Sequence, residues 1–409
     1  MTAHTVAPLA NDFSRARAEL LDWFTTQAMP LWSTAGTDWA QGGFAEKLDA
    51  QGQPVDEPRR TRVVARQLYV FSVARKLGWQ GDAPRWVEHG LHFLLTRQQQ
   101  ADGTFASSVT PAGQVVNARF DLYEQAFALF AMATAYRLDP AAHTHLPAVS
   151  ARVLSAVRSG WGHPAIGFEE SAPPSVPLRS NPHMHLFEAA LQWAEALPAG
   201  QAQADTPWRA LADELATLAL RHLVDAPSGL VTELFDADWG PMPGADGTLA
   251  EPGHQFEWGW LLTRWARQHP NPQHPDAVAA LAAAQRMVAL AEAHGIDPQR
   301  GVAINELNTD LSVRDANAKL WPQTERIKAW VAMAQQAQAE GRTDALAQAL
   351  QAATAAMAGL RAYLHHPVPG GWQEVWRADG SWQPEPVRAS SLYHIVCALE
   401  TLADATDLA

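Results

Sequence analysis

A histidine and a glutamate near the start of one predicted helix are the residues best suited to chemistry. In EPGHQFEWGW, His254 and Glu257 are three residues apart and face the same way on a helix. A carboxylate beside an imidazole holds the ring in one orientation and raises its basicity. We interpret the pair as a general base that can remove a proton from a substrate, with a purely structural histidine as the alternative.

Other predicted helix starts carry further polar and aromatic side chains. Arg66 shares one helix face with Arg62 and Tyr69 at the i, i+4 and i+7 positions, and it either contacts a substrate or ties the helix to a neighbouring segment. The other candidates are Tyr123, Trp321, Glu325, Trp372, Gln373, Glu374, Ser390, Ser391 and His394. Buried helices have no favourable place for unpaired polar groups, so the convergence of such groups from several segments favours a site.

Two histidines in RSNPHMHLFEA raise the question of a metal. Asn181 suits a helix N-cap and Pro182 the first helical position, so His183 and His185 fall in the first turn. Two histidines there could bind zinc, but the HxH spacing is not the i, i+4 pairing of a helical metal site. No Cys or HExxH motif completes a ligand set. The sequence therefore predicts no metal.

A sixfold repeat must position these residues. Glycine-rich, strand-like segments begin at residues 43, 103, 167, 229, 301 and 371, at steps of 60, 64, 62, 72 and 70 residues. Such a period accommodates two helices, a turn and a β-hairpin, and six units can close into a ring. Twelve helices are expected to begin near residues 12, 61, 83, 118, 146, 182, 207, 254, 276, 319, 343 and 387.

The two kinds of helix in the repeat predict two concentric rings. Helices that follow the six hairpins, such as LYEQAFALFAMA, are apolar on nearly all faces and suit an inner wall. The alternating helices are alanine-rich with charge on one side and suit an outer ring. We therefore predict an (α/α)6 barrel forming one domain over residues 1–409, with short β-hairpins and the starts of the inner helices at one mouth, where a site should lie.

Composition narrows the partners and the compartment. The net charge of −13 argues against nucleic acid, and no apolar run approaches the roughly 18 residues of a membrane span. The N-terminal segment lacks the pattern of a signal peptide, and the single cysteine, Cys397, suits a reducing compartment. A cytoplasmic protein is expected. Seventeen tryptophans include some that can serve as platforms for sugar rings, while most suit a large helical core.

At these same residues the chain resembles the N-acylglucosamine 2-epimerase superfamily, and within it the mannose isomerase branch. The resemblance is carried by ARQLYVFSVARKLGW, SNPHMHLFEA, EPGHQFEWGWLL, KLWPQTERIKA, GGWQEVW and SLYHIVCALE, which span nearly the whole chain. It implies the (α/α)6 barrel and an acid/base pair of His254 and His394. It also implies that Arg66 and His185 contact the reacting oxygens, and that a sugar pocket is formed by Asn181, Tyr123, Glu257, Trp321, Trp372 and Gln373.

The implied reaction is removal of a proton next to a sugar aldehyde through a cis-enediol(ate), with a monosaccharide substrate and no metal or redox cofactor. Transfer by one imidazole from C2 to C1 gives a ketose, as in interconversion of D-mannose with D-fructose or D-lyxose with D-xylulose. Two imidazoles on opposite faces give a 2-epimerase, and the sequence leaves this open. The sequence also leaves the oligomeric state open, and a homo-oligomer is one of the alternatives.

Two other function classes fit the fold less well. Barrels of this kind also support inverting glycoside hydrolysis by paired carboxylates, for which the candidates are Asp121, Glu257, Glu325 and Glu374. A non-catalytic sugar- or protein-binding barrel should lack acid/base groups, yet both His254 and His394 are present.

Overall fold

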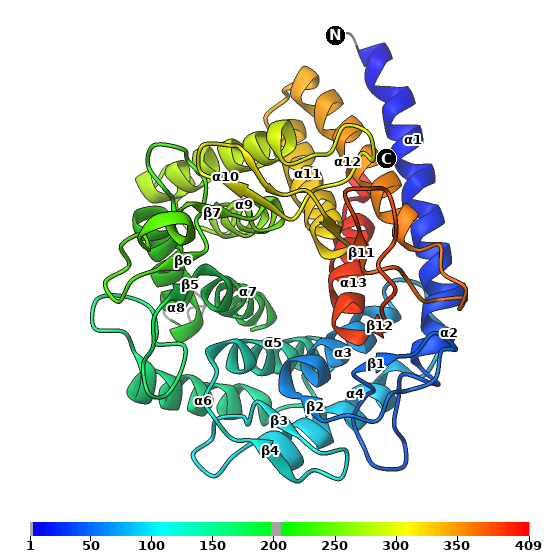
Figure 1. Cartoon of the computed structure of the whole chain (residues 1–409), viewed down its shortest axis with the longest axis vertical. Coiled ribbons are helices and arrows are strands. Elements are labelled where there is room, and N and C mark those ends of the chain that lie inside the picture. The colour runs from blue at the N-terminus through cyan, green and yellow to red at the C-terminus, as the bar shows by residue number, and fades with distance from the viewer. Residues whose placement is uncertain (1–2, 198–205, 409) are drawn as a thin grey trace.

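The computed structural model describes residues 3–197 and 206–408, which form two concentric rings of helices (Figure 1). The inner ring consists of α3 (Thr61–Ala74), α5 (Leu122–Leu138), α7 (Ser180–Ala196), α9 (Pro252–Arg267), α11 (Trp321–Ala339) and α13 (Ala389–Asp404). Each inner helix contacts the next, and α13 contacts α3, so the ring closes. The prediction of an (α/α)6 barrel is confirmed.

Six longer helices surround this ring, and one short helix follows the first of them. The outer helices are α1 (Ala3–Trp23), α4 (Ala83–Phe93), α6 (Leu146–Trp161), α8 (Pro207–Leu218), α10 (Pro275–His294) and α12 (Thr343–Tyr363). The short helix is α2 (Met29–Trp32), and π-helical turns end α1, α4 and α8. The inner helices are buried on nearly every face, whereas the outer helices bury one stripe, as the composition of each kind predicts.

Most predicted helix starts agree with the structure. The starts at residues 61, 83, 146, 207 and 343 are confirmed, and six others differ by one to four residues. The first helix was expected near Asp12 but begins at Ala3, because Pro8 lies inside it instead of ahead of it. Within the described residues no helix is long and apolar enough to cross a lipid bilayer.

The short strands pair mostly between neighbouring repeats. They are β1 (Lys47–Leu48), β2 (Arg59–Arg60), β3 (Ser108–Val109), β4 (Val115–Asn117), β5 (Leu178–Arg179), β6 (Leu234–Phe235), β7 (Leu249–Ala250), β8 (Glu306–Asn308), β9 (Val313–Asp315), β10 (Ala318–Lys319), β11 (Val375–Trp376) and β12 (Val387–Arg388). The antiparallel pairs are β12–β1, β2–β3, β3–β4, β5–β6, β7–β8, β8–β9 and β10–β11. The predicted hairpin within each repeat is present in most repeats: β3–β4 and β8–β9 pair within one glycine-rich segment, and the bridges Leu48–Pro54, Phe235–Pro241 and Trp376–Trp382 close a hairpin in three others.

These links between repeats tie the start of each inner helix to the next repeat. The strand just before an inner helix pairs with the following repeat, and before α5 a single bridge between Asp121 and Ser171 takes that place. The repeat glycines turn the chain from an outer helix into the strand segment, and Gly103 and Gly229 do so with φ of 90° and 80°, which favour glycine. The N-terminal ends of the inner helices are thereby gathered at one mouth.

Candidate active site

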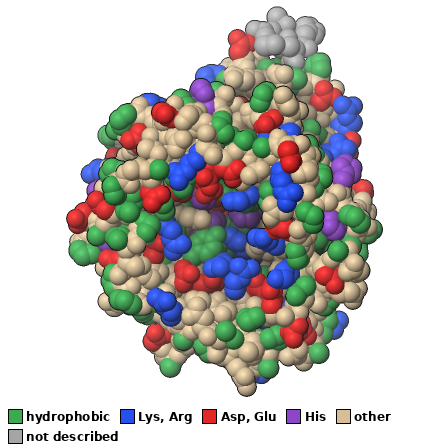
Figure 2. Space-filling view, viewed as in Figure 1, with side chains coloured by type: hydrophobic (Ala, Val, Ile, Leu, Met, Phe, Trp, Pro, Cys, Tyr) green, Lys and Arg blue, Asp and Glu red, His purple; other side chains and the backbone are tan. Residues whose placement is uncertain are grey.

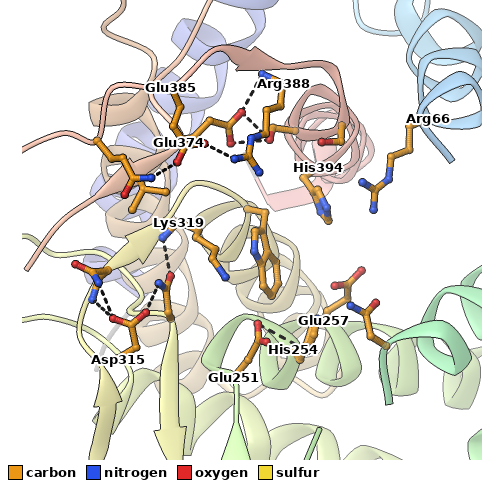
Figure 3. A pocket seen from close by; sticks show the side chains of 18 of the residues that line it. Arg66, Glu251, His254, Glu257, Asp315, Lys319, Glu374, Glu385, Arg388 and His394 are labelled. Carbon is orange, nitrogen blue, oxygen red and sulfur yellow. Dashed lines mark hydrogen bonds and ion pairs between the residues drawn. The ribbon is translucent and has the colours of Figure 1, made fainter. Parts of the chain in front are cut away.

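A cavity of about 540 Å³ opens at this mouth, between the starts of the inner helices and the strand segments. Figure 2 shows the hollow near the centre of the face, with basic and acidic side chains gathered around its rim. The cavity lies within the size range of small-molecule sites. Eleven of the predicted candidates line it: Arg66, Tyr123, Asn181, His185, His254, Glu257, Trp321, Glu374, Ser390, Ser391 and His394. Figure 3 labels Arg66, His254, Glu257, Glu374 and His394 among them.

His254, in the first turn of α9, has different partners from the one that the sequence predicted. Its Nδ1 lies 2.9 Å from a carboxylate oxygen of Glu233 and 4.0 Å from one of Glu251. The expected partner, Glu257, has no hydrogen bond from either oxygen. Helical side chains lean toward the N-terminus of their helix, so His254 faces the preceding turn instead of Glu257. The predicted role of Glu257 in orienting the His254 ring therefore falls to Glu233.

The two carboxylates near His254 set its charge. Burial alone would lower the pKa of His254, but Glu233 and Glu251 outweigh burial and raise it to about 10. At neutral pH the ring is therefore an imidazolium, with Nδ1–H donated to Glu233. Its Nε2–H is the proton that His254 can offer to a substrate oxygen in the cavity.

His394, on α13, has the opposite protonation state. Burial, the Arg66 guanidinium and the Lys328 ammonium hold the pKa of His394 well below its ordinary value of 6.5. The neutral ring has its Nδ1 2.9 Å from Oε1 of Glu325, an acceptor, so Nδ1 bears the hydrogen and Nε2 the free lone pair. The cavity thus holds one imidazole able to accept a proton and one able to donate.

An aromatic ring lies between the two imidazoles. The indole of Trp321, at the start of α11, has its centroid 4.9 Å from that of His254 and 5.8 Å from that of His394. Trp321 also packs against Gly253, where an added Cβ would lie 2.4 Å from the indole. Any side chain at that position would displace the indole, so the glycine allows Trp321 to contact both rings.

Arg66 and His185 lie deeper in the cavity. Nη2 of Arg66 donates to the Tyr123 hydroxyl at 2.8 Å, and its guanidinium lies 4.2 Å from the centroid of Phe127. Nδ1 of His185 lies 3.2 Å from Glu188. Burial outweighs that carboxylate and lowers the pKa of His185 to about 4, so this ring is neutral.

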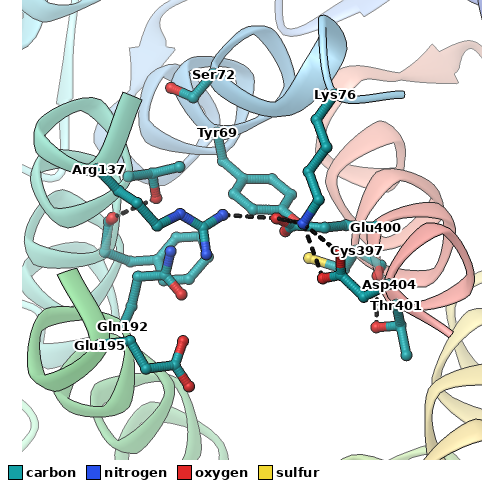
Figure 4. A network of polar contacts seen from close by, with 12 residues as sticks. Tyr69, Ser72, Lys76, Arg137, Gln192, Glu195, Cys397, Glu400, Thr401 and Asp404 are labelled. Atoms are coloured by element: carbon teal, nitrogen blue, oxygen red, sulfur yellow. Dashed lines mark hydrogen bonds and ion pairs between the residues drawn. The ribbon is translucent and has the colours of Figure 1, made fainter. Parts of the chain in front are cut away.

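The two companions of Arg66 on its helix face have other roles. Arg62 forms an ion pair with Glu124. Tyr69 lies at the far end of the barrel, where its hydroxyl donates to Glu400 at 2.6 Å (Figure 4). The i, i+4, i+7 spacing therefore predicted a shared helix face correctly, but of the three only Arg66 reaches the cavity.

Trp372 and Gln373 do not line the cavity. Trp372 is 1% exposed and stacks on Trp32 of α2, with ring centroids 5.2 Å apart, so it belongs to the core between the two rings of helices. The next residue but one, Glu374, lines the cavity instead and accepts hydrogen bonds from Ser391 and from the Trp372 indole. The placement of Trp372 and Gln373 in the sugar pocket is corrected accordingly.

Of the two histidines that suggested zinc, His185 lines the cavity and His183 does not. His183 is fully buried and its Nε2 lies 3.2 Å from the backbone nitrogen and 3.1 Å from the backbone oxygen of Phe168. Gln125, Gln255 and Gln323 make the same contacts with the backbone of their own repeats. His183 therefore holds the barrel together at a position that glutamine takes elsewhere.

Among the described residues, one group has the spacing of a metal site. His185, Glu188 and Glu257 bring donor atoms within 4.8 Å of one another. His185 and Glu188 are already hydrogen-bonded to each other, Tyr393 donates to Glu188, and Glu257 lies 3.9 Å from the Lys328 ammonium. His185 and Glu188 are thus already engaged by internal partners, which leaves Glu257 as the one unengaged carboxyl of the three, and we assign no metal to them.

Several cavity residues were missed by the sequence reasoning. Glu233 lies behind the cavity wall and holds His254, and the missed lining residues are Glu251, Asn305, Asp315, Asn317, Lys319, Gln383, Glu385 and Arg388. One signal was present: Glu46, Glu170, Glu233 and Glu374 occupy equivalent places after the repeat glycine. Each accepts a backbone N–H at the start of its inner helix. Glu233 is the member of this set that also holds a cavity histidine.

Fold and site together define a class of protein: a helical barrel with a cavity at one mouth that is lined by histidines, arginines and carboxyl groups. The family model for N-acylglucosamine 2-epimerase (GlcNAc 2-epimerase) matches residues 42–398, and the chain belongs to this family. It is therefore an isomerase, of the sugar isomerase and epimerase kind, and its substrate is a small-molecule sugar.

Relatives place the chain more closely within this family. It is 40% identical to the "Mannose-6-phosphate isomerase" of Rhizobium meliloti (strain 1021), over 96% of this chain and 98% of the relative. The structure of cellobiose 2-epimerase from Bacillus thermoamylovorans B4167 superposes with a TM-score of 0.81 at 17% identity, over 95% of this chain and 98% of the other. A crystal structure of D-mannose isomerase gives 0.80 at 17%, over 94% and 97%. These two structures support the fold.

Proposed function

We propose that the protein is an aldose–ketose isomerase that interconverts D-mannose and D-fructose, and possesses one active site at the mouth of a single-domain barrel. The observation that carries the proposal is the contrast between two imidazoles at one cavity: His254 lies beside the carboxylates of Glu233 and Glu251, which raise its pKa, whereas the charges of Arg66 and Lys328 help to hold the pKa of His394 low. Aldose–ketose conversion needs one group to remove a carbon-bound proton and another to protonate the carbonyl oxygen, and this pair supplies both.

The proposed reaction begins at C2 of the open-chain sugar. Nε2 of His394 takes the C2 proton, the electron pair forms the C1=C2 double bond, and Nε2–H of His254 protonates O1 to give the cis-enediol. His394 then returns its proton to C1 while the O2 proton passes back to His254 and C2 becomes the carbonyl. Arg66 stabilises the negative charge that develops on the oxygens, as preorganised donors do in such sites.

The other lining side chains fit roles in holding the sugar. Asn181 has a buried Oδ1 without a hydrogen-bond partner and can accept from a sugar hydroxyl. The carboxyl of Glu257 is buried without hydrogen bonds, and burial together with the neighbouring Glu325 raises its pKa well above the ordinary value. A neutral carboxyl can both donate to and accept from a hydroxyl. Tyr123, His185 and Trp321 complete the walls of the pocket.

The charges around the cavity favour a neutral sugar over a phosphorylated one. Besides the neutral Glu257, four carboxyl side chains line it, against one lysine, two arginines and the charged His254, which Glu233 already holds. Arg388 already forms an ion pair with Glu385, and Arg66 lies in the deep part of the cavity with Tyr123. Lys319 is then the remaining cation near the mouth, too little for a dianionic group among carboxylates. We therefore propose unphosphorylated D-mannose, with D-lyxose as a shorter alternative substrate.

A 2-epimerase is the second candidate, and one observation favours it. Two imidazoles, those of His254 and His394, both contact Trp321 at one cavity, and removal and return of a proton at opposite faces of C2 needs two such groups. The hydrolase hypothesis has less support: of its carboxyls, Asp121 caps α5, and Glu325 is fully buried and engaged with His394.

Incubation of the enzyme with D-mannose in D₂O, followed by NMR, separates these candidates. The proposal predicts fructose as the main product, with part of the C2 hydrogen retained at C1. Glucose as the main product with full deuterium at C2 would establish the epimerase instead. Parallel assays with D-mannose 6-phosphate test the substrate, because a higher kcat/KM for the phosphate would contradict the charge argument. Unchanged D-mannose, D-lyxose and D-fructose would reject the proposed substrates altogether.

A further inference from the structure

Lys328 lies in the interior of the barrel, one turn below the site. It is on α11, its side chain is fully buried, and it is the one lysine among the described residues with no solvent exposure. Its Nζ is 2.5 Å from Oε2 of Glu325, 3.9 Å from Oε1 of Glu257 and 4.0 Å from the centroid of Trp260. A buried ammonium is costly unless its surroundings require the charge, so its place beside the site needs an explanation.

The ion pair of Lys328 continues directly into the cavity. Glu325 uses one oxygen for Lys328 and the other for Nδ1 of His394, at 2.9 Å. Lys328, Glu325 and His394 therefore form a chain from the core to the proposed base, although only His394 lines the cavity. We call these three residues the Lys328 chain.

We infer that Lys328 is a positioning residue that keeps Glu325 ionised and His394 neutral, so that Nε2 of His394 faces the sugar with a free lone pair. The inference rests on the proposed function for its catalytic meaning, whereas the proton count itself is a property of the folded protein.

The charge balance of the Lys328 chain explains this role. With the ammonium in place, an ionised Glu325 accepts the Nδ1 hydrogen of a neutral His394, and the pair's single negative charge is matched. Without the ammonium, the pair has an unmatched buried negative charge and takes up a proton at higher pH. Whether that proton resides on Glu325 or on the imidazole, Nε2 of His394 then bears a hydrogen and cannot act as a base.

The other charged groups around His394 do not replace Lys328. Arg66 faces the ring from α3 and His254 from α9, and both disfavour an added proton on His394; from α7, Glu188 favours one. None of these three contacts Glu325, which is the group whose protonation would reverse the tautomer of His394. Lys328 is the cation in direct contact with that carboxylate.

The test is an NMR titration of His394 in the wild type and in Lys328→Met, using protein with isotope-labelled histidine. His394→Asn identifies the signal. We expect the midpoint for His394 to rise by about 1–3 pH units in Lys328→Met, the range for loss of a neighbouring opposite charge. The acid limb of the kcat/KM profile should rise with it. An unchanged midpoint in folded Lys328→Met would overturn the inference.

Matched controls separate charge from packing and from the proposed reaction. Lys76→Met removes a lysine paired with Glu400 and Asp404 at the far end of the barrel, and it should leave the His394 midpoint unchanged (Figure 4). Lys328→Arg keeps the positive charge and should have the same His394 midpoint as the wild type. The titration needs no turnover, so a failure of the isomerase proposal would leave this result interpretable.

A second pair of variants covers a failure of Lys328→Met to fold. Glu325→Gln and the double variant Glu325→Gln/Lys328→Met both lack the carboxylate of the Lys328 chain, so neither leaves an unpaired buried negative charge there. The midpoint of His394 should be higher in the double variant than in Glu325→Gln, by less than the rise expected for Lys328→Met alone. Equal midpoints in these two variants would likewise overturn the inference.

Discussion

Replacing Glu233 by glutamine tests the origin of the charge on His254. The side chain keeps nearly the same shape, but the negative charge beside Nδ1 is lost. At the observed 2.9 Å, two unit charges attract by about 6 kcal/mol at an effective dielectric constant of about 20, and by about 1.4 kcal/mol in bulk water. At 1.36 kcal/mol per pKa unit, these limits correspond to a fall of about 1 to 4 units.

The expected result is a shift of one limb of the pH profile. In the wild type the pKa of His254 is about 10, so the acid form is present throughout the neutral range. In Glu233→Gln, with Glu251 still 4.0 Å away, we expect a fall of about 2 units, in the middle of the calculated range. The basic limb of kcat/KM for D-mannose should move down by the same amount, while the acid limb stays in place.

Glu170→Gln is the matched control for this substitution. Glu170 occupies the equivalent place in another repeat, accepts the backbone N–H and the Nε–H of Arg179, and contacts no cavity histidine. Both variants lose one carboxylate that binds the start of an inner helix, so both should lose stability. Only Glu233→Gln should move the basic limb. A limb that stays in place in Glu233→Gln, or that moves equally in both variants, would refute the assignment of His254 as the acid.

Three further outcomes are expected. His254→Asn and His394→Asn should each lower kcat by at least about 100-fold, the lower end for a general acid or base, with unchanged circular dichroism; near-wild-type kcat in either would exclude that residue from the proton transfer. The free energy of unfolding should fall as pH rises from about 6.5, the unfolded-state value, through the folded pKa of about 10, because the raised pKa of His254 stabilises the fold only while the ring is protonated. Urea titrations should give a smaller total fall between these pH values for Glu233→Gln, and an equal total fall would contradict the shift. Dialysis against a strong chelator should leave kcat unchanged, and a loss that one divalent ion restores would replace the histidine mechanism by a metal-dependent one.

The sequence predicted the barrel because its evidence is local and repeated. Each glycine-rich segment, each all-round apolar helix and each alanine-rich helix is recognisable within a few turns of chain, and six copies at a similar spacing favour a closed ring. The same reasoning placed the starts of the inner helices at one mouth. Arg66, His185, His254 and His394 were therefore expected near one another, and all four line the cavity.

Strand pairing was less predictable, because each strand is only two or three residues long. Such segments contain too little alternation to specify a partner. The hairpins within most repeats were expected, whereas the pairing of the strand before an inner helix with the next repeat follows from the ring geometry and was not. Trp372 was misplaced for a related reason: its stacking partner, Trp32, is far away in sequence and comes from the opposite end of the chain.

The sequence by itself determined which histidines are available for chemistry, and the tertiary structure decided what each can do. Imidazole chemistry is evident from residue type, but the pKa of a buried ring depends on charges a few ångströms away in space. His254 is charged because of Glu233, 21 residues earlier, and His394 has its Nδ1 beside Glu325, 69 residues earlier. Helix spacing suggested Glu257 as the partner of His254 because it displays only neighbours on the same helix. The partners that set the protonation states come from other elements, and only the closed barrel brings them into contact.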